Sequence, residues 1–582
     1  MKGYPINNAD VLILGGGISG LIASIKAREG GAERVTVIDK SKAGKSGCSA
    51  FGAGVFRSYI KSEDDFDATR RELVRVNHDM IDQEWNDLMM ERTHALVVEM
   101  DQWGVEWEKT ADGKYKRTMI RSGAPDRPLK ALMFHGPQLM EALRKEALKR
   151  GVVIKDRVMV TDLISDGQRV SGAVGFNVRT GEIEVSLARA TVLSTGGTAY
   201  KTAFLGHKTQ TGEAQAMLYR AGGTLMNFDQ CGQHVSCAQF DTAGMSMFVA
   251  EGGRFVNSKD EPFLHIYDPV FKDRTQLFMV AGAMAMEIIG GLGPIYLDMT
   301  HFEPEQVDRL RRVVPLPTMI LTRAGLIKDN RIVKKIEWIP TNFGTIATGG
   351  GAKIDFACKT ALQGLFASGD ASSKIAISPA QTGPLPWAAV SGAVAGEEAA
   401  RYASGSTEPV LDEEQARGLT KTTLEPLLRK NGVAPSHVFL LIAEAVAPYD
   451  VAVIKSQSSL NKTLNALIEI KTSQLPLLFA YDPHHLMLVH EARSMVLNAE
   501  MWIRSCLARK ESRGTLMRTD YPYIDNDNWL KWVLLKKEND EMKIWTEDIP
   551  VERYGVKPFP GKRLHPVFEG ANRRRITWEF GG

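Results

Sequence analysis

The sequence has few cysteines and no closely spaced pair of them. Its five cysteines stand at positions 48, 231, 237, 358 and 506, and none has the Cys-x-x-Cys spacing of metal ligands. We therefore expect no iron–sulfur cluster and no structural zinc site within this chain. The odd number of cysteines and the lack of a secretory signal pattern predict a cytoplasmic protein.

Long apolar runs and a strong charge of one sign are also missing. No stretch approaches the ~18 uninterrupted apolar residues of a transmembrane helix, so none is expected. Lys and Arg number 72 against 69 Asp and Glu, a formal net charge of +3. Without a basic stripe, this small excess gives no reason to expect nucleic acid as a partner. A chain of 582 residues with 44% hydrophobic and 24% charged residues is typical of a soluble enzyme of several domains.

A glycine-rich turn follows the first strand that the sequence predicts. Gly15, Gly17 and Gly20 form G-x-G-x-x-G between an apolar strand at 10–14 and helical spacing at 18–29. The first glycine lets the strand turn sharply, and the second lets the backbone approach a pyrophosphate. The third lets the helix pack on the strand. The unit predicts a Rossmann-like dinucleotide site.

The segments that follow distinguish FAD from NAD. A second strand at 34–38 ends in Asp39, a carboxylate placed to accept hydrogen bonds from a ribose. The small-residue loop "DKSKAGKSGCSAFGAG" comes directly after it and suits an extended ligand. "TVLSTGG" at 191–197 and "GLFASGDAS" at 364–372 end like strands that enter a ligand crevice, and Asp370 is a candidate for ribityl or pyrophosphate contacts. Together these features favour FAD.

These motifs, with "TGEAQAM", "EGGRFVN" and the C-terminal "ARKESRG", resemble the flavoprotein subunits of fumarate reductase, succinate dehydrogenase, L-aspartate oxidase and adenylylsulfate reductase. The resemblance extends over nearly the whole chain. It implies an α/β protein with a Rossmann-like FAD-binding domain in two parts, an inserted α+β capping domain and a C-terminal helical domain. The predicted ranges are 1–224 and 341–410 for the FAD-binding domain, 225–340 for the capping domain, and 411–582 for the helical domain with an irregular tail.

The resemblance also implies which residues hold FAD. The dinucleotide site would comprise Gly15, Gly17, Gly20, Asp39 and Lys40. The flavin-side loop would contribute Ser46, Gly47, Ser49 and Gly52, with Glu213, Asp370 and Leu385 further along the ligand. Several members of the family carry a covalently bonded histidine where Gly47 stands, so we expect non-covalent FAD. Cys48 is adjacent, and a cysteinyl link stays open beside the favoured interpretation of a buried small residue.

Two charged positions that clamp dicarboxylates in the fumarate-type enzymes are replaced here. "GTIATGG" places Thr345 at the position of a histidine, and "PAQTGPLPW" places Gln381 or Thr382 at that of an arginine. A dicarboxylate bound without these groups would keep poorly compensated charge. The departures argue against plain fumarate or succinate as substrate.

Four residues are candidates for catalysis by the same resemblance. Lys272 in "FKDRTQ" aligns with the family's proton-donating arginine, and Arg274 is two residues further on. Either is a candidate to donate a proton or to bind an anion, with a solvated charge run as the alternative. His234 and Arg254 stand near the family's substrate segments, with a satisfied histidine and a structural ion pair as the alternatives.

We therefore expect an FAD-dependent oxidoreductase that acts on a small-molecule substrate, such as an activated C=C compound. One alternative is a flavoprotein like that of adenylylsulfate reductase with an iron–sulfur, ferredoxin-like partner, which the C-terminal "RKESRG" segment favours. The other is a flavin electron-transfer module without a substrate of its own. The oligomeric state stays open.

Overall fold

Seven strands form the central sheet of the computed structural model, which describes residues 5–119, 121, 129–346, 349–373 and 383–578. The strand order is β6-β2-β1-β9-β8-β7, with β18 also paired to β9. The parallel part consists of β1 (Ile6–Leu14), β2 (Val35–Asp39), β6 (Val153–Asp156), β9 (Ile183–Leu193) and β18 (Leu365–Ala367). Apolar side chains on both faces of β1 explain why it lies at the centre of the sheet.

An antiparallel meander extends one edge of this sheet. It is formed by β7 (Val158–Ser165), β8 (Val170–Asn177) and β9. The turn signals between residues 157 and 189 predict this meander, and the structure confirms it. The predicted helix at 18–29 is also confirmed as α1 (Ile18–Glu29).

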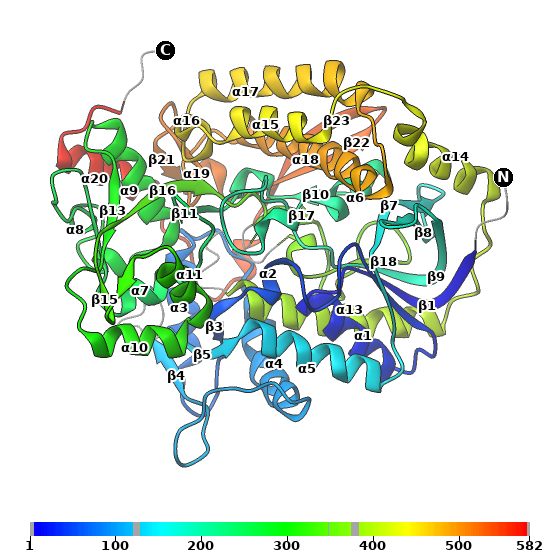
Figure 1. Cartoon of the computed structure of the whole chain (residues 1–582), viewed down its shortest axis with the longest axis horizontal. Helices are drawn as coiled ribbons and strands as arrows, with labels where there is room; N and C mark the ends of the chain where they lie inside the picture. The colour runs from blue at the N-terminus through cyan, green and yellow to red at the C-terminus, as the bar shows by residue number, and fades with distance from the viewer. Residues whose placement is uncertain (1–4, 120, 122–128, 347–348, 374–382, 579–582) are drawn as a thin grey trace.

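Helices cover one face of the sheet. Helix α1 packs against α13 (Pro384–Ser404) and α5 (Gly136–Lys149), and α13 also contacts α4 (Gln83–Gln102). Figure 1 shows these helices side by side beneath β1. Because α1 is enclosed by the sheet and these helices, ten of its twelve residues are buried, and its sequence lacks a polar face.

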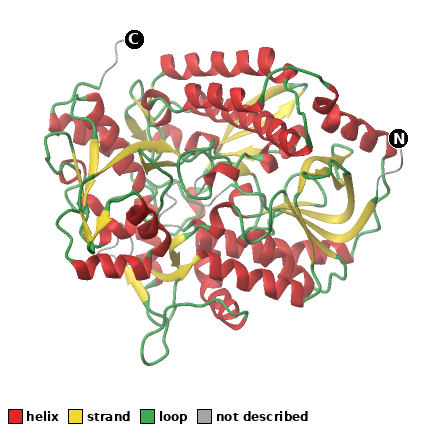
Figure 2. Ribbon diagram, in the orientation of Figure 1, coloured by secondary structure: helices red, strands yellow, loops and turns green. Residues whose placement is uncertain are grey.

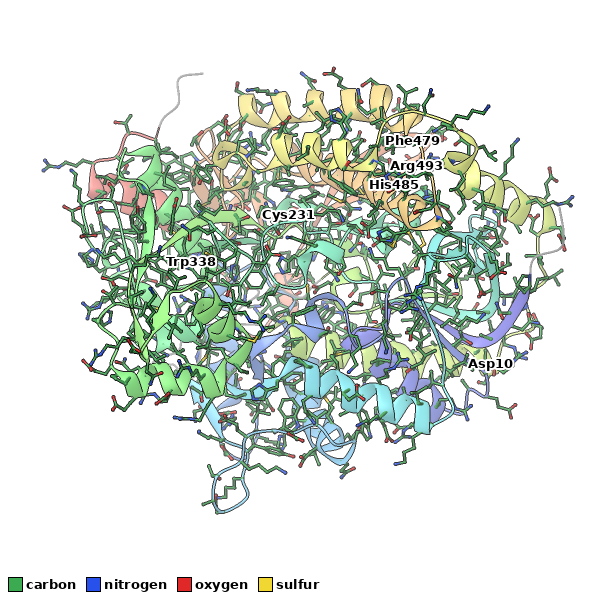
Figure 3. The ribbon with its side chains drawn as sticks, viewed as in Figure 1. Asp10, Cys231, Trp338, Phe479, His485 and Arg493 are labelled. Carbon is green, nitrogen blue, oxygen red and sulfur yellow. The ribbon has the colours of Figure 1, made fainter. Side chains whose placement is uncertain are left out.

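A second, antiparallel sheet lies in the segment between the two parts of the FAD-binding sequence. Its order is β11 (Gln233–Cys237), β16 (Ile336–Asn342), β13 (Ile295–Asp298) and β12 (Arg254–Val256). The apolar helix α9 (Leu277–Ile289) packs on this sheet and shares a core with Trp338. This unit is the green region of Figure 1, and Trp338 is labelled in its interior in Figure 3.

A small three-stranded sheet lies beside α13. It contains β3 (Ala53–Arg57), β5 (Lys130–His135) and β4 (Arg117–Met119), in the order β3-β5-β4. Val55 on β3 is directly opposite Met133 on β5, and Arg57 is opposite Ala131. Directly opposed residues share one face of a sheet.

The C-terminal part is mainly helical. Its longest helices are α14 (Glu413–Leu424), α15 (Pro435–Val446), α17 (Gln457–Glu469) and α18 (Pro483–Ala508). Three of them, α15, α17 and α18, form the upper layer in Figures 1 and 2. Figure 3 shows Phe479, His485 and Arg493 in this layer, far from Asp10 on β1.

The tail was expected to be irregular, but it contains a regular β-hairpin of β22 (Lys531–Glu538) and β23 (Glu541–Asp548). Strand β22 pairs with β10 (Leu225–Met226), which also pairs with β17 (Gly351–Ala352). The pairing partner lies about three hundred residues earlier in the chain, so local sequence did not predict it. The division into domains at 224, 340 and 410 stays a prediction.

The other elements are short. The helices are α2 (Gly47–Ala50), α3 (Phe66–Val76), α6 (Glu213–Arg220), α7 (Met245–Ala250), α8 (Leu264–Tyr267), α10 (Pro304–Val313), α11 (Pro315–Arg323), α16 (Tyr449–Ala452), α19 (Asn526–Trp529) and α20 (Pro566–Arg574). The strands are β14 (Ile327–Lys328), β15 (Arg331–Ile332), β19 (Ile454–Lys455), β20 (Met517–Arg518), β21 (Tyr523–Asp525) and β24 (Lys562–Leu564). Single 3-10 turns include η3 (Lys272–Arg274) and η4 (Gly369–Ala371).

Candidate active site

A cavity opens where the parallel strands of the central sheet end. Its volume is about 380 Å³. It is lined by Leu14 at the end of β1, Ile38 in β2, Ser194 directly after β9 and Gly369 after β18. In open α/β sheets, ligands bind in the crevice outside the carboxyl ends of the strands. The three glycine-rich strand ends of the sequence thus meet around one cavity.

The glycine turn forms one end of this cavity. Gly15 and Gly17 line it, whereas Gly20 packs inward, since a Cβ there would lie 1.9 Å from the carbonyl oxygen of Gly15. Gly17 is the N-cap of α1, the Ile18 N–H in the first turn donates to the Ser49 hydroxyl at 3.3 Å, and that turn holds no acidic residue. The N-terminal end of a helix carries partial positive charge. This end is therefore suited to an anionic pyrophosphate.

A buried charge cluster lies beside the turn. The Lys40 ammonium donates to Glu213 at 2.6 Å, to Glu491 at 2.8 Å and to the Thr211 hydroxyl at 2.8 Å. Burial opposes the charge, but the two carboxylates outweigh it and raise the pKa of Lys40 above its usual value. Lys40 and Glu213 both line the cavity. Because they form an ion pair, their opposite charges compensate each other.

Asp39 is held by the backbone around it. One of its carboxylate oxygens accepts from the Gly16 N–H at 2.8 Å, and the other from the Ser41 N–H at 2.7 Å. Burial raises the pKa of Asp39, and these two hydrogen bonds oppose the rise. The carboxylate lines the cavity in a fixed orientation, and each oxygen keeps a lone pair for a ligand hydroxyl.

The segment that contains the short helix α2 forms another wall. Ser46, Gly47, Ser49 and Gly52 all line the cavity. Gly47 has φ +75°, and a Cβ there would lie 2.9 Å from the side-chain nitrogen of Gln210. A larger residue would therefore be strained at this position, where backbone alone faces the cavity.

The far part of the cavity is aromatic. His234 stacks on Phe343 with ring centroids 4.1 Å apart, and His207 meets the same ring edge-on at 4.1 Å. Phe204 packs against all three rings. Burial lowers the pKa of both histidines to about 3, so both imidazoles are neutral at physiological pH. This wall is aromatic and uncharged.

Comparison with known families agrees with this geometry. The family described as "FAD binding domain" matches residues 10–378, and the family described as "Fumarate reductase flavoprotein C-term" matches residues 444–563. The first match alone spans more than half of the chain. The chain belongs to the fumarate reductase and succinate dehydrogenase flavoprotein family. It is an FAD-dependent oxidoreductase with a Rossmann-like FAD-binding fold.

Curated members of the family resemble the chain over most of their length. A subunit of the fumarate reductase (CoM/CoB) of Methanothermobacter marburgensis is 25% identical over 91% of this chain and 97% of its own. The mitochondrial succinate dehydrogenase flavoprotein subunit of Oryza sativa is 26% identical over 95% and 92%. These identities are similar, so they do not select one substrate.

Solved structures of the family share the fold. Escherichia coli quinol fumarate reductase FrdA superposes with a TM-score of 0.84 at 22% identity, over 95% of this chain and 98% of that one. Adenylylsulfate reductase of Archaeoglobus fulgidus superposes with a TM-score of 0.75 at 20% identity, over 99% and 98%. The fold therefore spans different chemistries within the family.

Most of the predicted cofactor residues of this flavoprotein surround the cavity. Asp370 in η4 and Leu385 at the start of α13 also line the cavity. Of the twelve predicted FAD contacts, only Gly20 is absent from the lining, for the packing reason given above. Their contacts with FAD stay predictions.

The four predicted catalytic residues divide into two pairs. Arg274 and His234 line the cavity, whereas Lys272 and Arg254 do not. Lys272 is exposed at φ +50° in η3, and Arg254 is exposed on β12. Arg274 donates from its guanidinium to the Met119 carbonyl at 3.4 Å. The cavity therefore favours Arg274 over Lys272 as the residue that meets a substrate.

Sequence reasoning missed two buried arginines in the cavity wall. Arg57 ends β3, and Arg121 follows β4. Arg121 donates to the carbonyls of Asp273 and Thr275 at 2.8 and 2.7 Å, and so ties η3 to the small sheet. Arg57 lies two residues after Val55, so the two side chains share a face if this segment is a strand. No strand was predicted here, so the sequence alone did not place Arg57 in the cavity.

The resemblance predicts that Thr345 stands at the position of the family's histidine clamp. Thr345 is fully buried, and its hydroxyl accepts from the Thr198 N–H at 2.9 Å. It does not line the cavity. Gln381 and Thr382, at the arginine position, lie outside the described residues.

Two features are absent from the residues that the structure describes. None of their helices is long and apolar enough to cross a membrane. Among these same residues, no group of three or more His, Cys, Asp or Glu side chains is arranged to hold a metal ion.

Replacing Glu491 by Gln will lower the melting temperature at pH 7 and have little effect in acid. Burial would raise the pKa of Glu491, but Lys40 and Lys201 outweigh it and hold that pKa below its ordinary value of 4.5. A lowered carboxyl pKa stabilises the folded state fully above 4.5, and this contribution is lost as the pH falls through the folded-state value. The measurement is melting temperature against pH for both proteins.

The exposed Glu444 offers a control for this prediction. Glu444→Gln should leave the melting curve unchanged at every pH. A difference for Glu491→Gln that persists undiminished at pH values well below 4.5 would show that packing, not charge, supplies the stabilisation.

Proposed function

We propose that this flavoprotein transfers two electrons between non-covalently bound FAD and an organic substrate with an activated C=C bond, other than plain fumarate or succinate. The observation that carries the choice of substrate is the burial of Thr345. Its hydroxyl is bonded to backbone, so this position offers no cation for the second carboxylate of a dicarboxylate. The stacked rings of His234 and Phe343 suit an apolar, unsaturated body instead.

The residues around the cavity fit FAD. Gly15 and Gly17, with the N-terminal end of α1, would hold the pyrophosphate, and Asp39 and Asp370 would bind sugar and ribityl hydroxyls. The N-terminal end of α13 at Leu385 would face the flavin pyrimidine ring, and this helix has no acid in its first turn. The partial positive charge there favours a reduced, anionic ring.

FAD supplies the electron pair in this chemistry, and the chain supplies orientation and a proton. Arg274 lines the cavity from η3, and it is our candidate for the group that holds or delivers that proton. The neutral His207 and His234 would pack against the substrate rather than titrate. Non-covalent binding is supported by Gly47, which has no side chain to bond.

We also propose that a separate electron carrier, of the iron–sulfur type, exchanges electrons with the flavin. The relatives from Methanothermobacter marburgensis and Oryza sativa are both named as subunits of an enzyme. The scattered cysteines leave this chain without ligand spacing for a cluster. Residence in the cytoplasm stays a prediction.

The proposal is tested with the holoprotein under anaerobic conditions. Acid precipitation should release the flavin into the supernatant. The intact protein is then photoreduced, and fumarate, an enoyl thioester, or AMP with sulfite is added in separate cuvettes while the flavin band is followed. We expect the enoyl compound to reoxidise the flavin and fumarate to have no effect.

Each other outcome has a definite meaning. Rapid reoxidation by fumarate would overturn the argument from Thr345. A response to AMP with sulfite alone would favour the adenylylsulfate-reductase-like alternative. Flavin that stays with the precipitate would point to Cys48 and contradict non-covalent binding.

A further inference from the structure

Arg57 brings a buried positive charge to the cavity. It is the last residue of β3, only 6% of its surface is exposed, and it lines the cavity. Its neighbour across the sheet is Ala131, whose other neighbour is Thr118 on β4. Arg57 and Thr118 therefore stand on one face, on either side of a small residue, and both line the cavity.

The Arg57 guanidinium lacks the partners that a buried arginine ordinarily has. Its Nε and Nη1 atoms are buried without a hydrogen-bond acceptor in the part of the chain that the structure describes. The nearby acid, Asp64, is paired with Arg117 and also accepts from the Ile60 N–H at 2.9 Å. Asp64 is therefore already bonded to other groups, and no hydrogen bond or ion pair joins it to Arg57 among the described residues.

Arg117 in the same sheet shows what a satisfied arginine looks like. Its side chain is only 3% exposed, yet it pairs with both Asp64 and Glu63. Burial lowers the pKa of Arg57 to about 10, and the charge of Asp64 opposes the fall. Arg57 is thus still a cation at neutral pH, and an unpaired buried cation is unfavourable unless a ligand supplies the opposite charge.

The neighbouring arginines are engaged in a different task. Arg121 donates to the carbonyls of Asp273 and Thr275, and Arg274 to the carbonyl of Met119. These contacts join the segment around η3 to the end of β4 and the residues that follow it. Arg57 makes no such contact with the described residues. A Cβ added at Gly383 would lie 3.5 Å from the Cβ of Arg57, so Arg57 lies beside the start of α13.

The surroundings of Arg57 are apolar. Val55 on the same strand and Met133 on β5 lie on the same face of the sheet as Arg57. Leu277 and Met247 line the same cavity from the inserted segment. The stacked His234 and Phe343 complete this apolar wall. The cavity thus combines the Arg57 guanidinium, whose buried Nε and Nη1 lack acceptors in the described part of the chain, with apolar and aromatic side chains, while Arg121 and Arg274 in the same lining donate to backbone carbonyls.

We propose that Arg57 binds the carboxylate of the substrate and that the substrate is an unsaturated monocarboxylate with an apolar or aromatic body. This inference rests on the proposed function and names the substrate class of the same site. One carboxylate matches one unpaired guanidinium, which presents two N–H groups in the geometry that a carboxylate accepts.

Arg57 also has a role in the chemistry. In the reductive direction, bound FAD would supply a hydride equivalent to the β carbon as the C=C π bond breaks, and a proton would join the α carbon. The substrate would gain the two electrons that the reduced flavin loses. Negative charge grows on the carboxylate oxygens before the proton arrives, and a guanidinium fixed beside them stabilises it.

The test measures binding to the oxidised holoprotein, without turnover. trans-Cinnamate and its neutral amide, cinnamamide, are titrated while the flavin absorption band is followed. We expect the wild type to bind cinnamate more tightly than the amide. Arg57→Met should weaken cinnamate about 10- to 100-fold, as expected for loss of a charge-assisted hydrogen bond, and leave the amide unchanged.

Two further variants make the result specific. Arg57→Lys keeps the charge and should restore part of the affinity for cinnamate. Arg92→Met removes an arginine that pairs with Glu397 away from the cavity and should change neither ligand. Flavin content and melting temperature are recorded for each variant, and if Arg57→Met loses FAD, the comparison of acid and amide in the wild type decides.

The proposal is overturned if the wild type binds cinnamamide as tightly as cinnamate, or binds neither. It is also overturned if Arg57→Met shifts the midpoint potential of the flavin and leaves cinnamate affinity intact, since Arg57 would then face the flavin ring. If cinnamate binds through Arg57 but neither cinnamate nor the enoyl thioester reoxidises the reduced flavin, the carboxylate site stands and the proposed function fails.

Discussion

Gly15→Ala will yield protein that carries almost no FAD. Gly15 has φ +107°, and a Cβ there would lie 2.3 Å from the carbonyl oxygen of Ser194 and 2.8 Å from the Cα of Thr195. Both obstacles are backbone atoms at the end of β9, a strand that pairs with β1 along its length. Neither strand can move without disturbing the centre of the sheet, so the turn itself must change shape.

The measurement is the ratio of flavin to protein absorbance after purification, together with the melting temperature. Gly31→Ala is the matched control, because Gly31 also has positive φ, at +90°, but no described atom lies within 4 Å of its added Cβ. That control should cost ~1–2 kcal/mol of stability from backbone strain alone and keep its FAD. Full flavin content in Gly15→Ala would show that the turn does not form the pyrophosphate site.

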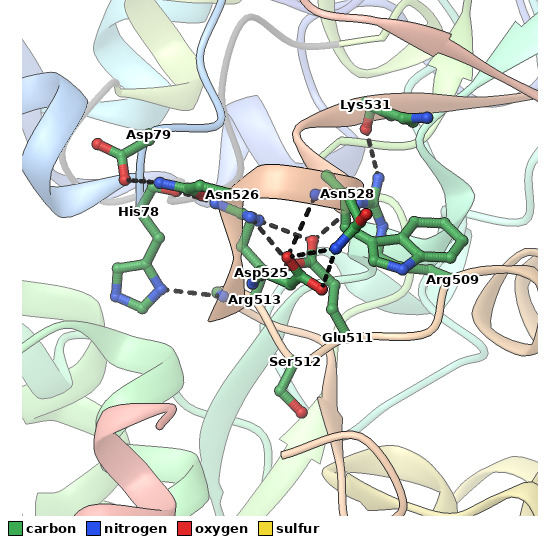
Figure 4. Close-up of polar contacts among 12 residues, drawn as sticks. His78, Asp79, Arg509, Glu511, Ser512, Arg513, Asp525, Asn526, Asn528 and Lys531 are labelled. Atoms are coloured by element: carbon green, nitrogen blue, oxygen red, sulfur yellow. Dashed lines mark hydrogen bonds and ion pairs between the residues drawn. The ribbon is translucent and has the colours of Figure 1, made fainter. Parts of the chain in front are cut away.

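Asp229→Ala will strongly destabilise the protein, although Asp229 touches no described part of the cavity. Its carboxylate accepts from Arg509 at 2.6 Å, Arg509 pairs with Glu511 at 2.9 Å, and Glu511 pairs with Arg513 at 2.8 Å. All four side chains are completely buried. Figure 4 shows Glu511 between the two arginines, with Arg509 also donating to the Lys531 carbonyl at 2.6 Å.

Removing Asp229 leaves two buried cations to share one carboxylate. The loss of one partner of a buried ion pair costs about 3–5 kcal/mol, and we expect a large fall in the melting temperature. The exposed pair of Arg401 and Glu398 gives the control, since Arg401→Ala should cost less than about 1 kcal/mol. The double variant Asp229→Leu with Arg509→Met removes both charges of the pair, so it should be more stable than Asp229→Ala. A double variant that is no more stable than Asp229→Ala would contradict the charge argument.

The FAD-binding part of this protein was readable from sequence because its signals are local. The three glycines at 15, 17 and 20, the helix that follows and Asp39 lie within one unit of β1, α1 and β2. Each has a fixed stereochemical reason, so spacing alone predicts the turn. The family resemblance, and not local spacing, places Thr345 where a charged residue stands in the fumarate-type enzymes, and this assignment stays a prediction.

The residues that meet the substrate were much harder to predict from the sequence. Lys272 and Arg274 are two residues apart, and only the structure shows that Arg274 lines the cavity whereas Lys272 does not. A 3-10 turn sends neighbouring side chains in different directions, and its path depends on Arg121, more than a hundred residues earlier. Arg57 was missed for a similar reason, because its lack of a partner among the described residues is a property of the folded surroundings.

By itself, the sequence determined the family, the cofactor and the class of fold, since glycine spacing and strand–turn–helix units act over short distances and are written in consecutive residues. The tertiary structure decided the β22–β10 pairing, the burial of the Asp229–Arg509–Glu511–Arg513 cluster and which cations reach the cavity. Those features join segments hundreds of residues apart. Whether a charge is paired or free depends on which distant side chains and backbone atoms fold around it, and the order of residues along the chain does not record that.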